Sequence, residues 1–325
     1  MRKKSLVACL LLMAVLASAE DALVPPPGSL MITTAVTVGW SPGIYDVNGA
    51  FQQYNSGDGN WTFLNLSLAL ELGLSDWISA GVVWAPGANL WSQTDLKVAP
   101  IFDFTKANVN VPYDPLVGFK LQLIGPKAPY ASDKVRLAVA PGVKIPLPAP
   151  DMYSESNKYI DGKEFLISDP ELRAFGVGAA LYADLILNES AFLNFYFQHM
   201  QFAPVKKNAE FNPVAPVNVK ISYDYLYLDT VEIEPHYRMP LGSAMKLGAS
   251  LPLRARLQAD YSKDGAIQTG SGYFLMNLEP KLVLLLTGTP IPLEFKLGYE
   301  FSVMGLNRGA QRMLTLLMRP LLKVF

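Results

Sequence analysis

The sequence of 325 residues contains few of the side chains that most often carry enzyme chemistry. It has one cysteine, Cys9, and only two histidines, His199 and His236. A single cysteine allows no internal disulfide. We also find no metal-ligand spacing, no glycine-rich phosphate loop and no nucleophile elbow. We therefore expect neither an enzyme nor a bound cofactor.

Long hydrophobic runs and a charge excess are missing as well. No segment after residue 20 approaches the 18 or so consecutive apolar residues of a transmembrane helix, although half of all residues are hydrophobic. The formal net charge is only −1, which argues against nucleic acid as a partner. The hydrophobic residues must belong either to a large soluble β protein or to a membrane barrel.

Residues 1–19 have the pattern of a secretory signal peptide. Three basic residues precede an apolar run of 11 residues from Leu6 to Leu16, and small residues follow at Ala17 and Ala19. This run is too short to span a bilayer, and we expect cleavage after Ala19. The residues before Cys9 also have the form of a lipobox, but cleavage there would leave no apolar segment ahead of the site. Loss of residues 1–19 leaves 24 basic and 28 acidic residues, a net charge of −4.

Apolar and polar residues alternate along most of the remaining chain. In WTFLNLSLALELG, residues 61–73, every even position from 64 to 72 is leucine, while Asn65, Ser67 and Glu71 lie between them. A spacing of two predicts a β-strand with one apolar face. The pattern predicts twelve strands, at residues 29–40, 61–73, 77–86, 115–125, 135–147, 172–187, 191–203, 217–241, 245–262, 273–288, 293–304 and 312–325.

The connections between these strands alternate in length. Segments 41–60, 87–114, 148–171, 204–216, 263–272 and 305–311 are long or polar, whereas the others are mostly tight turns such as LSD, NES and GSA. Such sorting is typical of an outer-membrane barrel, which has an even number of strands and both chain ends on the short-turn side. We predict that residues 20–325 form one all-β domain, a transmembrane antiparallel up-and-down β-barrel in the bacterial outer membrane. A soluble β-sandwich is the alternative.

Aromatic residues and the C-terminus are interpreted in the same way. Amphipathic rings are expected at the lipid headgroups. Phe325 resembles the terminal signal by which barrel-assembly machinery recognises such proteins, but Lys323 and Arg319 interrupt the apolar positions in phase with it. We therefore expect a bulge near Pro320 or a partly irregular last strand. The aromatic residues expected at the two interfaces are Trp40, Trp61, Trp84, Tyr223, Tyr261 and Tyr273 toward the long loops, with Trp77 and Tyr237 near the short turns.

In a barrel, alternate side chains face lipid and the interior, so the polar positions predict the lining of the lumen. Its near-equal mixture of charges predicts little preference for anions or cations. The expected lumen residues are Glu71, Lys120, Gln122, Arg136, Lys144, Asp184, Asp224, Glu232, Glu234, His236, Arg238, Lys246, Arg254, Arg256, Asp260, Glu279, Lys281, Glu294, Lys296 and Glu300.

Folding adjacent strands about their turns pairs some of these charges across strands. The pairs are Glu232 with Arg254, Arg256 with Glu279, and Lys281 with Glu300. They either satisfy a polar interior or line a path for a solute. His236 is expected to be a satisfied interior residue. His199 is expected to face lipid, where a phospholipase histidine would lie, but the motif of that family is absent.

The hairpin LNLSLALELGLSDWISAGVVWAP, residues 64–86, resembles hairpins of FadL-like transporters and of the related barrels of phenol-degradation (MetA-pathway) operons. FadL-like proteins have fourteen strands and an N-terminal plug, whereas only EDALVPPPGSL, residues 20–30, leads into the first strand here. The segment DLKVAPIFDF, residues 95–104, could supply a further hairpin and raise the count to fourteen.

The resemblance implies a channel or transporter for passive uptake of small solutes, hydrophobic compounds included, with outer-membrane lipid and a small molecule as partners. The alternative is a structural or surface-interaction barrel with a closed lumen, whose long loops act as an adhesin or antigen.

Overall fold

The computed structural model describes residues 21–53, 61–92, 109–111, 114–147, 174–210 and 218–324. Side chains are described within these ranges except at 61–64, 86–92, 109–111, 207–210 and 218–221. The predicted signal peptide, the segment 95–104 and Phe325 lie outside the described residues. Among the described residues, no helix is long and apolar enough to cross a membrane.

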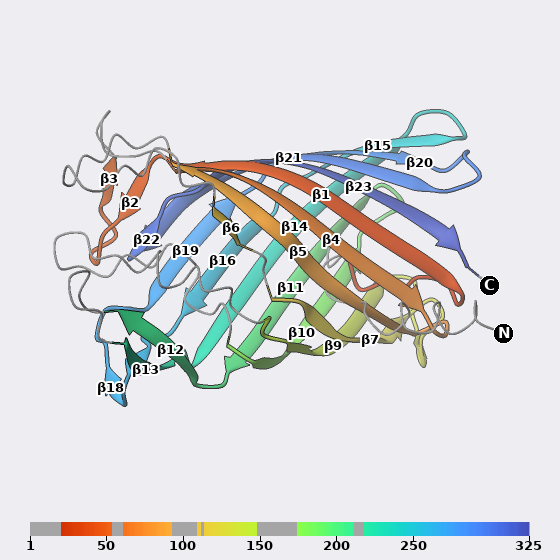
Figure 1. Cartoon of the computed structure of the whole chain (residues 1–325). Helices are drawn as coiled ribbons and strands as arrows, with labels where there is room; N and C mark the ends of the chain where they lie inside the picture. The colour runs from red at the N-terminus through yellow and green to blue at the C-terminus, as the bar shows by residue number, and fades with distance from the viewer. Residues whose placement is uncertain are drawn as a thin grey trace.

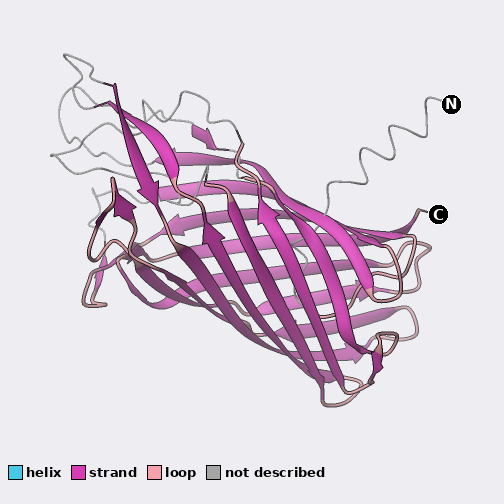
Figure 2. Cartoon of the chain, turned by 90° about the horizontal axis from the view of Figure 1, so that it is seen from below, coloured by secondary structure: helices cyan, strands magenta, loops and turns pink. Residues whose placement is uncertain are grey.

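Twelve strands form one closed antiparallel barrel, as predicted (Figures 1 and 2). Two of the twelve are each broken into two pieces, β15 with β16 and β19 with β20. The barrel strands are β1 (Ser29–Ser41), β4 (Trp61–Gly73), β5 (Ile78–Ser92), β7 (Leu116–Gly125), β9 (Val135–Lys144), β10 (Gly176–Ile186), β11 (Ala191–Phe202), β14 (Tyr227–Pro240), β15 (Met245–Ser250) with β16 (Leu253–Gln258), β19 (Tyr273–Leu278) with β20 (Lys281–Leu286), β21 (Leu293–Leu306) and β23 (Arg312–Lys323).

The ring closes where β1 pairs with β23, Ser29 lying opposite Lys323. The start of β1 and the end of β23 therefore share one rim, the rim with the short turns (Figure 1). Short strands β6 (Val109–Val111) and β8 (Tyr130–Ala131) pair beside β5 and β7. Because the ring closes with twelve strands, the alternative of fourteen is not realised.

The two faces of the wall differ in the way a membrane requires. Along β14, Glu232 and Glu234 point inward and are 5% and 1% exposed, whereas Val231 and Ile233 point outward and are 45% and 41% exposed. On β23, Leu316 is likewise exposed. An apolar exterior on a closed ring leaves no unpaired strand edge in hydrocarbon. The molecule is a transmembrane β-barrel with a polar interior.

Beyond the long-loop rim, the chain forms two smaller sheets. The first contains β12 (Val205–Glu210), β13 (Asn218–Asp224), β17 (Ser262–Lys263) and β18 (Ala266–Ile267), and the second contains β2 (Gly43–Tyr45), β3 (Phe51–Gln53) and β22 (Arg308–Gly309) (Figure 1). The predicted single strand 217–241 is therefore wrong. The chain turns at Leu226, whose φ is 54°, and only β14 belongs to the barrel.

Proline residues explain where two strands break. Pro252 separates β15 from β16, and Pro280 separates β19 from β20, because neither residue has an N–H for the ladder. β23 passes Pro320 differently. Its register with β1 is the same on both sides of that residue, since Met31 lies opposite Leu321 and Thr34 opposite Met318. The predicted bulge is therefore wrong, but the ladder to β1 is interrupted at Pro320 and Arg319, so the strand is irregular there on that side.

Two of the predicted interface aromatics, Tyr223 and Tyr273, are buried instead, and Tyr261 is partly buried. Tyr223 stacks on Tyr225 with ring centroids 5.9 Å apart, and Tyr261 packs against both rings. Tyr273 is buried beside Tyr45. Tyr223 lies in β13 and Tyr261 beyond the end of β16, so the lipid-facing alternation of the wall does not extend to either of them. Of the other aromatics, Tyr237 is exposed and Trp40, Trp77 and Trp84 are partly exposed, while the side chain of Trp61 is outside the described part.

Candidate functional site in the barrel interior

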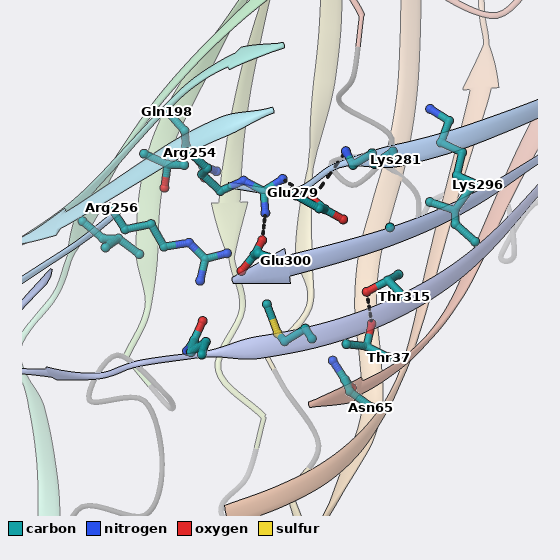
Figure 3. A pocket seen from close by; sticks show the side chains of 16 residues that line it. Thr37, Asn65, Gln198, Arg254, Arg256, Glu279, Lys281, Lys296, Glu300 and Thr315 are labelled. Atoms are coloured by element: carbon teal, nitrogen blue, oxygen red, sulfur yellow. Dashed lines mark hydrogen bonds and ion pairs between the residues drawn. The ribbon is translucent and has the colours of Figure 1, made fainter. Parts of the chain in front are cut away.

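A cavity of about 540 Å³ lies in the interior and is lined by eight of the twelve wall strands (Figure 3). Its lining is mostly polar and contains four cationic and two acidic side chains. The lining residues are Thr37, Asn65, Gln198, Leu228, Thr230, Arg254, Arg256, Glu279, Lys281, Lys296, Gly298, Glu300, Gln311, Met313, Thr315 and Leu317.

Arg254 of β16 is the centre of the charge network at this cavity. Its Nε donates to Glu232 Oε2, and its Nη1 donates to Glu300 Oε2 at 2.8 Å. Its Nη2 lies 3.8 Å from Glu279 Oε2. Asn277 Nδ2 donates to the other oxygen of Glu300 at 2.7 Å. The guanidinium of Arg254 thus contacts three carboxylates, which lie on β14, on β21 and between β19 and β20.

Lys281 extends the network toward the short-turn rim. Its Nζ lies 3.3 Å from Glu234 Oε1 and 3.5 Å from Glu279 Oε2. Ser250 Oγ donates to Glu234 Oε1 at 2.7 Å. His236 Nε2 lies 3.2 Å from Glu234 Oε2, so this histidine is part of the ion-pair network.

The histidine is also fixed from the neighbouring strand. Asn194 Nδ2 lies 3.0 Å from His236 Nε2, and the ring stacks on Phe192 at 4.3 Å between centroids. Arg238 lies over the same Phe192 ring, 4.8 Å from its centroid. Among the described residues, no group of three or more His, Cys, Asp and Glu side chains is arranged to hold a metal ion.

Glu294 organises a third set of charges near the short turns. Its Oε2 accepts from Arg319 Nη2 at 2.7 Å and lies 3.5 Å from Lys296 Nζ, and its Oε1 lies 3.6 Å from Arg238 Nη2. Arg319 was recognised in the sequence only as an interruption of an apolar phase. The odd positions of β23 face the interior, so that interruption marks a lumen residue.

The segment that precedes β1 is held by β7, β9 and β10, three wall strands that do not line this cavity. The backbone N–H of Ala22 donates to both oxygens of Asp184, at 3.1 Å each. Lys120 Nζ donates to the carbonyl oxygens of Asp21 and Leu23 at 2.8 and 2.7 Å. Arg136 Nη1 lies 3.7 Å from Asp184 Oδ2. Residues 21–23 therefore lie inside the barrel and are held by charged lumen residues.

Small side chains make room for this segment. Ala22 is fully buried among Ala138, Ala140 and Ala180. At the rim, a Cβ added to Gly73 would clash with the carbonyl oxygens of the prolines at 25 and 26. The inward-facing alanines Ala138 and Ala140 of β9 and Ala180 of β10 were a sequence signal for an occupied interior that the predictions did not include.

Glu71 and Lys144 lie at opposite ends of this part of the interior. Glu71 Oε1 accepts from Ser79 Oγ at 2.6 Å and lies 4.0 Å from Lys120 Nζ. Lys144 Nζ donates to Asp114 Oδ2 at 2.8 Å and to the carbonyl oxygen of Ala174 at 2.9 Å. Asp114, which also binds the N–H of Leu147, was missed in the sequence because it lies just before the predicted strand.

Of the three predicted cross-strand pairs, one is formed and two are wrong. Glu232 lies opposite Arg254. Arg256 lies opposite Leu275 instead of Glu279, and Lys281 opposite Gly298 instead of Glu300. The turn beyond β16 is centred at residues 264 and 265, which both have positive φ, and not between 267 and 268. The partners are displaced by even numbers of residues, so each side chain keeps its face while its partner changes.

Three other residues expected in the lumen have different surroundings. Asp224 accepts from the N–H of Leu226, and Asp260 accepts from the N–H groups of glycines 270 and 272, so both stabilise loops. Lys246 is exposed at the short-turn rim.

His199 points outward on β11. Its Nδ1 lies 2.7 Å from Asp229 Oδ1, and its ring packs against Tyr227. Both partners belong to β14. Within the described part of the chain, neither histidine bonds to a serine, threonine or cysteine.

The fold and the interior together define an outer-membrane β-barrel, the class predicted from the sequence. No family model and no curated protein matches the sequence. The fold is similar to that of the COG4313 outer membrane channel from Pseudomonas putida F1, with a TM-score of 0.65, 12% identity, and coverage of 94% of this chain and 100% of that chain. At such low identity the likeness shows the fold alone.

Two further solved barrels are more distant. The β domain of the Bordetella autotransporter BrkA matches with a TM-score of 0.46 and 12% identity, over 89% of this chain and 98% of that chain. The Pseudomonas putida toluene transporter TodX matches with a TM-score of 0.44 and 11% identity, over 97% and 99%.

Proposed function

We propose that this protein is an outer-membrane channel for the passive uptake of small solutes. The observation that carries the proposal is the polar cavity of about 540 Å³ inside a barrel with an apolar exterior. Its volume lies within the range of roughly 300–1,000 Å³ that small-molecule sites occupy. A lumen that served only to brace the wall would be filled by side chains.

The lining favours solutes that carry a polar group. Six of the lining side chains are charged, and hydroxyl and amide groups supply most of the remainder. Leu228, Met313 and Leu317 add apolar contacts. An amphipathic molecule fits this lining better than a pure hydrocarbon. A hydrocarbon would displace water from the charged lining groups without offering them hydrogen-bonding partners. The P. putida F1 protein of similar fold is described as a channel, which agrees with the proposal.

A closed structural or surface-interaction barrel is the second candidate, and one observation favours it. Residues 21–23 occupy part of the interior and are bound there by Lys120 and Asp184. We propose that this segment narrows the path without ending transport, since the strands that contact it, β7, β9 and β10, do not line the cavity. No enzyme activity is assigned to either histidine.

The purified full-length protein in a planar bilayer tests the choice. Discrete conductance steps, together with swelling of proteoliposomes in isotonic solutions of small polar solutes, are expected for a channel. A barrel that is correctly inserted yet silent in both assays would favour the closed barrel. Insertion is checked by protease resistance of the reconstituted protein, so that silence cannot be attributed to misfolded material.

A further inference from the structure

The two arginines of β16 that face the cavity differ in their partners. Arg254 contacts three carboxylates. Arg256, two residues further along the same face, forms no ion pair or hydrogen bond with any described side chain (Figure 3). Its guanidinium is open to the cavity and is only partly exposed overall. The cavity therefore presents a fixed cation without a protein counter-ion among the described residues.

The acidic residues that line the cavity, and Glu232 beside them, already have cationic partners. Glu232 and Glu300 bind Arg254, and Glu279 lies between Arg254 and Lys281. Among the charged residues that line the cavity, cations outnumber carboxylates by four to two. A buried or half-buried charge is costly unless it is paired. An anionic ligand would supply the missing partner.

The residues around Arg256 favour a particular shape and polarity of ligand as well as a negative charge. Across the strands it lies opposite Thr230 on one side and Leu275 on the other. Leu228 is the next inward-facing residue of β14 and packs with the cluster that contains Leu275. A guanidinium presents a planar fork that matches a carboxylate through two parallel hydrogen bonds. Beside this fork the cavity lining offers Leu228 as an apolar contact and Thr230 as a polar one.

We propose that Arg256 forms a carboxylate-binding site in the cavity, which takes a small monocarboxylate with a short apolar body. The carboxylate lies on the guanidinium, and the apolar body lies along Leu228. This inference rests on the proposed channel function and names the solute class. Although basic and acidic residues nearly balance over the whole interior, the cavity lining has more cationic than acidic side chains.

Equilibrium binding tests the site without requiring transport. The full-length protein in detergent is titrated calorimetrically at pH 7 with hexanoate and with hexanamide, a neutral analogue of the same shape. The wild type is expected to bind hexanoate and to bind hexanamide at least about tenfold more weakly, the scale expected for loss of charge-assisted hydrogen bonds.

Three variants complete the test. Arg256→Gln should weaken hexanoate binding by about tenfold or more, and Arg256→Lys should retain part of it because the charge remains without the fork. Arg312→Gln is the matched control, because Arg312 is exposed on the outer face of β23, and should bind as the wild type does. Correct folding of each variant is checked by protease resistance.

The outcomes separate this inference from the channel itself. Equal binding of hexanoate and hexanamide, or wild-type binding by Arg256→Gln, would overturn the carboxylate site. A wild type that conducts ions but binds no hexanoate would overturn the site and leave the channel proposal standing. A wild type that binds hexanoate in an Arg256-dependent way but never conducts would support the site and contradict the channel.

Discussion

At the scale of single residues, the alternation of apolar and polar residues predicts well on which face of a strand a side chain lies. It predicts poorly with which residue that side chain pairs. Arg254 and Arg256 both point inward, as their parity requires, but one binds three carboxylates and the other none in the described part of the chain. Partner choice depends on register, and register depends on where a turn is centred. A displacement by two or four residues leaves every face correct and changes every pair.

Removal of Arg254 should therefore cost much more stability than removal of Arg256. In Arg254→Ala, Glu232 and Glu300 lose their cation inside the barrel, and a broken buried pair costs about 3–5 kcal/mol. The side chain of Arg254 is 23% exposed, so the lower end of that range is expected. Arg256→Ala should change stability by less than about 1 kcal/mol. The measurement is the urea midpoint of refolded protein in lipid vesicles, and equal losses would contradict the network described for Arg254.

Asp184 is expected to hold the segment before β1 inside the lumen. Asp184→Ala removes both acceptors for the Ala22 N–H and one partner of Arg136, so the segment should leave the lumen more often. We expect larger or more frequent conductance steps in planar bilayers. Asp76→Ala is the control, because Asp76 pairs with Lys127 at an exposed turn. A conductance that is unchanged in Asp184→Ala would mean that residues 21–23 do not obstruct the path.

At the scale of elements, the sequence predicts nearly every wall strand to within a few residues, because one face meets lipid and the other does not. Its errors have local causes. The break at Pro252 is invisible to a pattern of alternating polarity, since the alternation continues across it. The segment 218–224 alternates like a wall strand yet pairs with β12 outside the barrel. Alternating polarity indicates only that the two faces of a strand have different surroundings. A small sheet outside the barrel rim can also have one apolar and one polar face.

The phase of β23 provides a direct test of this element. Leu316 lies near the middle of β23 and faces outward, whereas its neighbour Thr315 lines the cavity opposite Gly298. Leu316→Arg should destabilise the barrel by about 2–4 kcal/mol, the cost of an arginine on the lipid face near the bilayer midplane. Thr315→Arg should cost far less, because its charge enters a polar cavity instead of hydrocarbon. The unfolding midpoints of both variants in vesicles give the comparison, and a reversed order would place β23 in the opposite phase.

At the scale of the whole molecule, closure followed from the sequence because hydrocarbon tolerates no open strand edge. Strand number and the sorting of loops followed because each crossing has its own alternating segment and each connection its own length. The state of the lumen did not, since it depends on contacts between distant segments. Ala22 and Asp184 are 162 residues apart in sequence, and no local pattern predicts their contact. The cavity likewise exists only because eight strands bring their inner faces together.

The sorting of loops predicts how the barrel is oriented in the cell. Long loops of such barrels face outward, and short turns face the periplasm. Epitope tags inserted within 41–60, 87–114 or 148–171 should bind antibody on intact cells, because the wall strands that flank these segments end or begin at the long-loop rim. Tags within 188–190 or 242–244 should bind only after the outer membrane is permeabilised, since these turns lie at the rim shared by β1 and β23. A periplasmic marker stained in parallel verifies that the cells are intact. Exposure of the short-turn tags alone would invert the topology, and exposure of both sets on cells with an unstained marker would contradict a single transmembrane orientation.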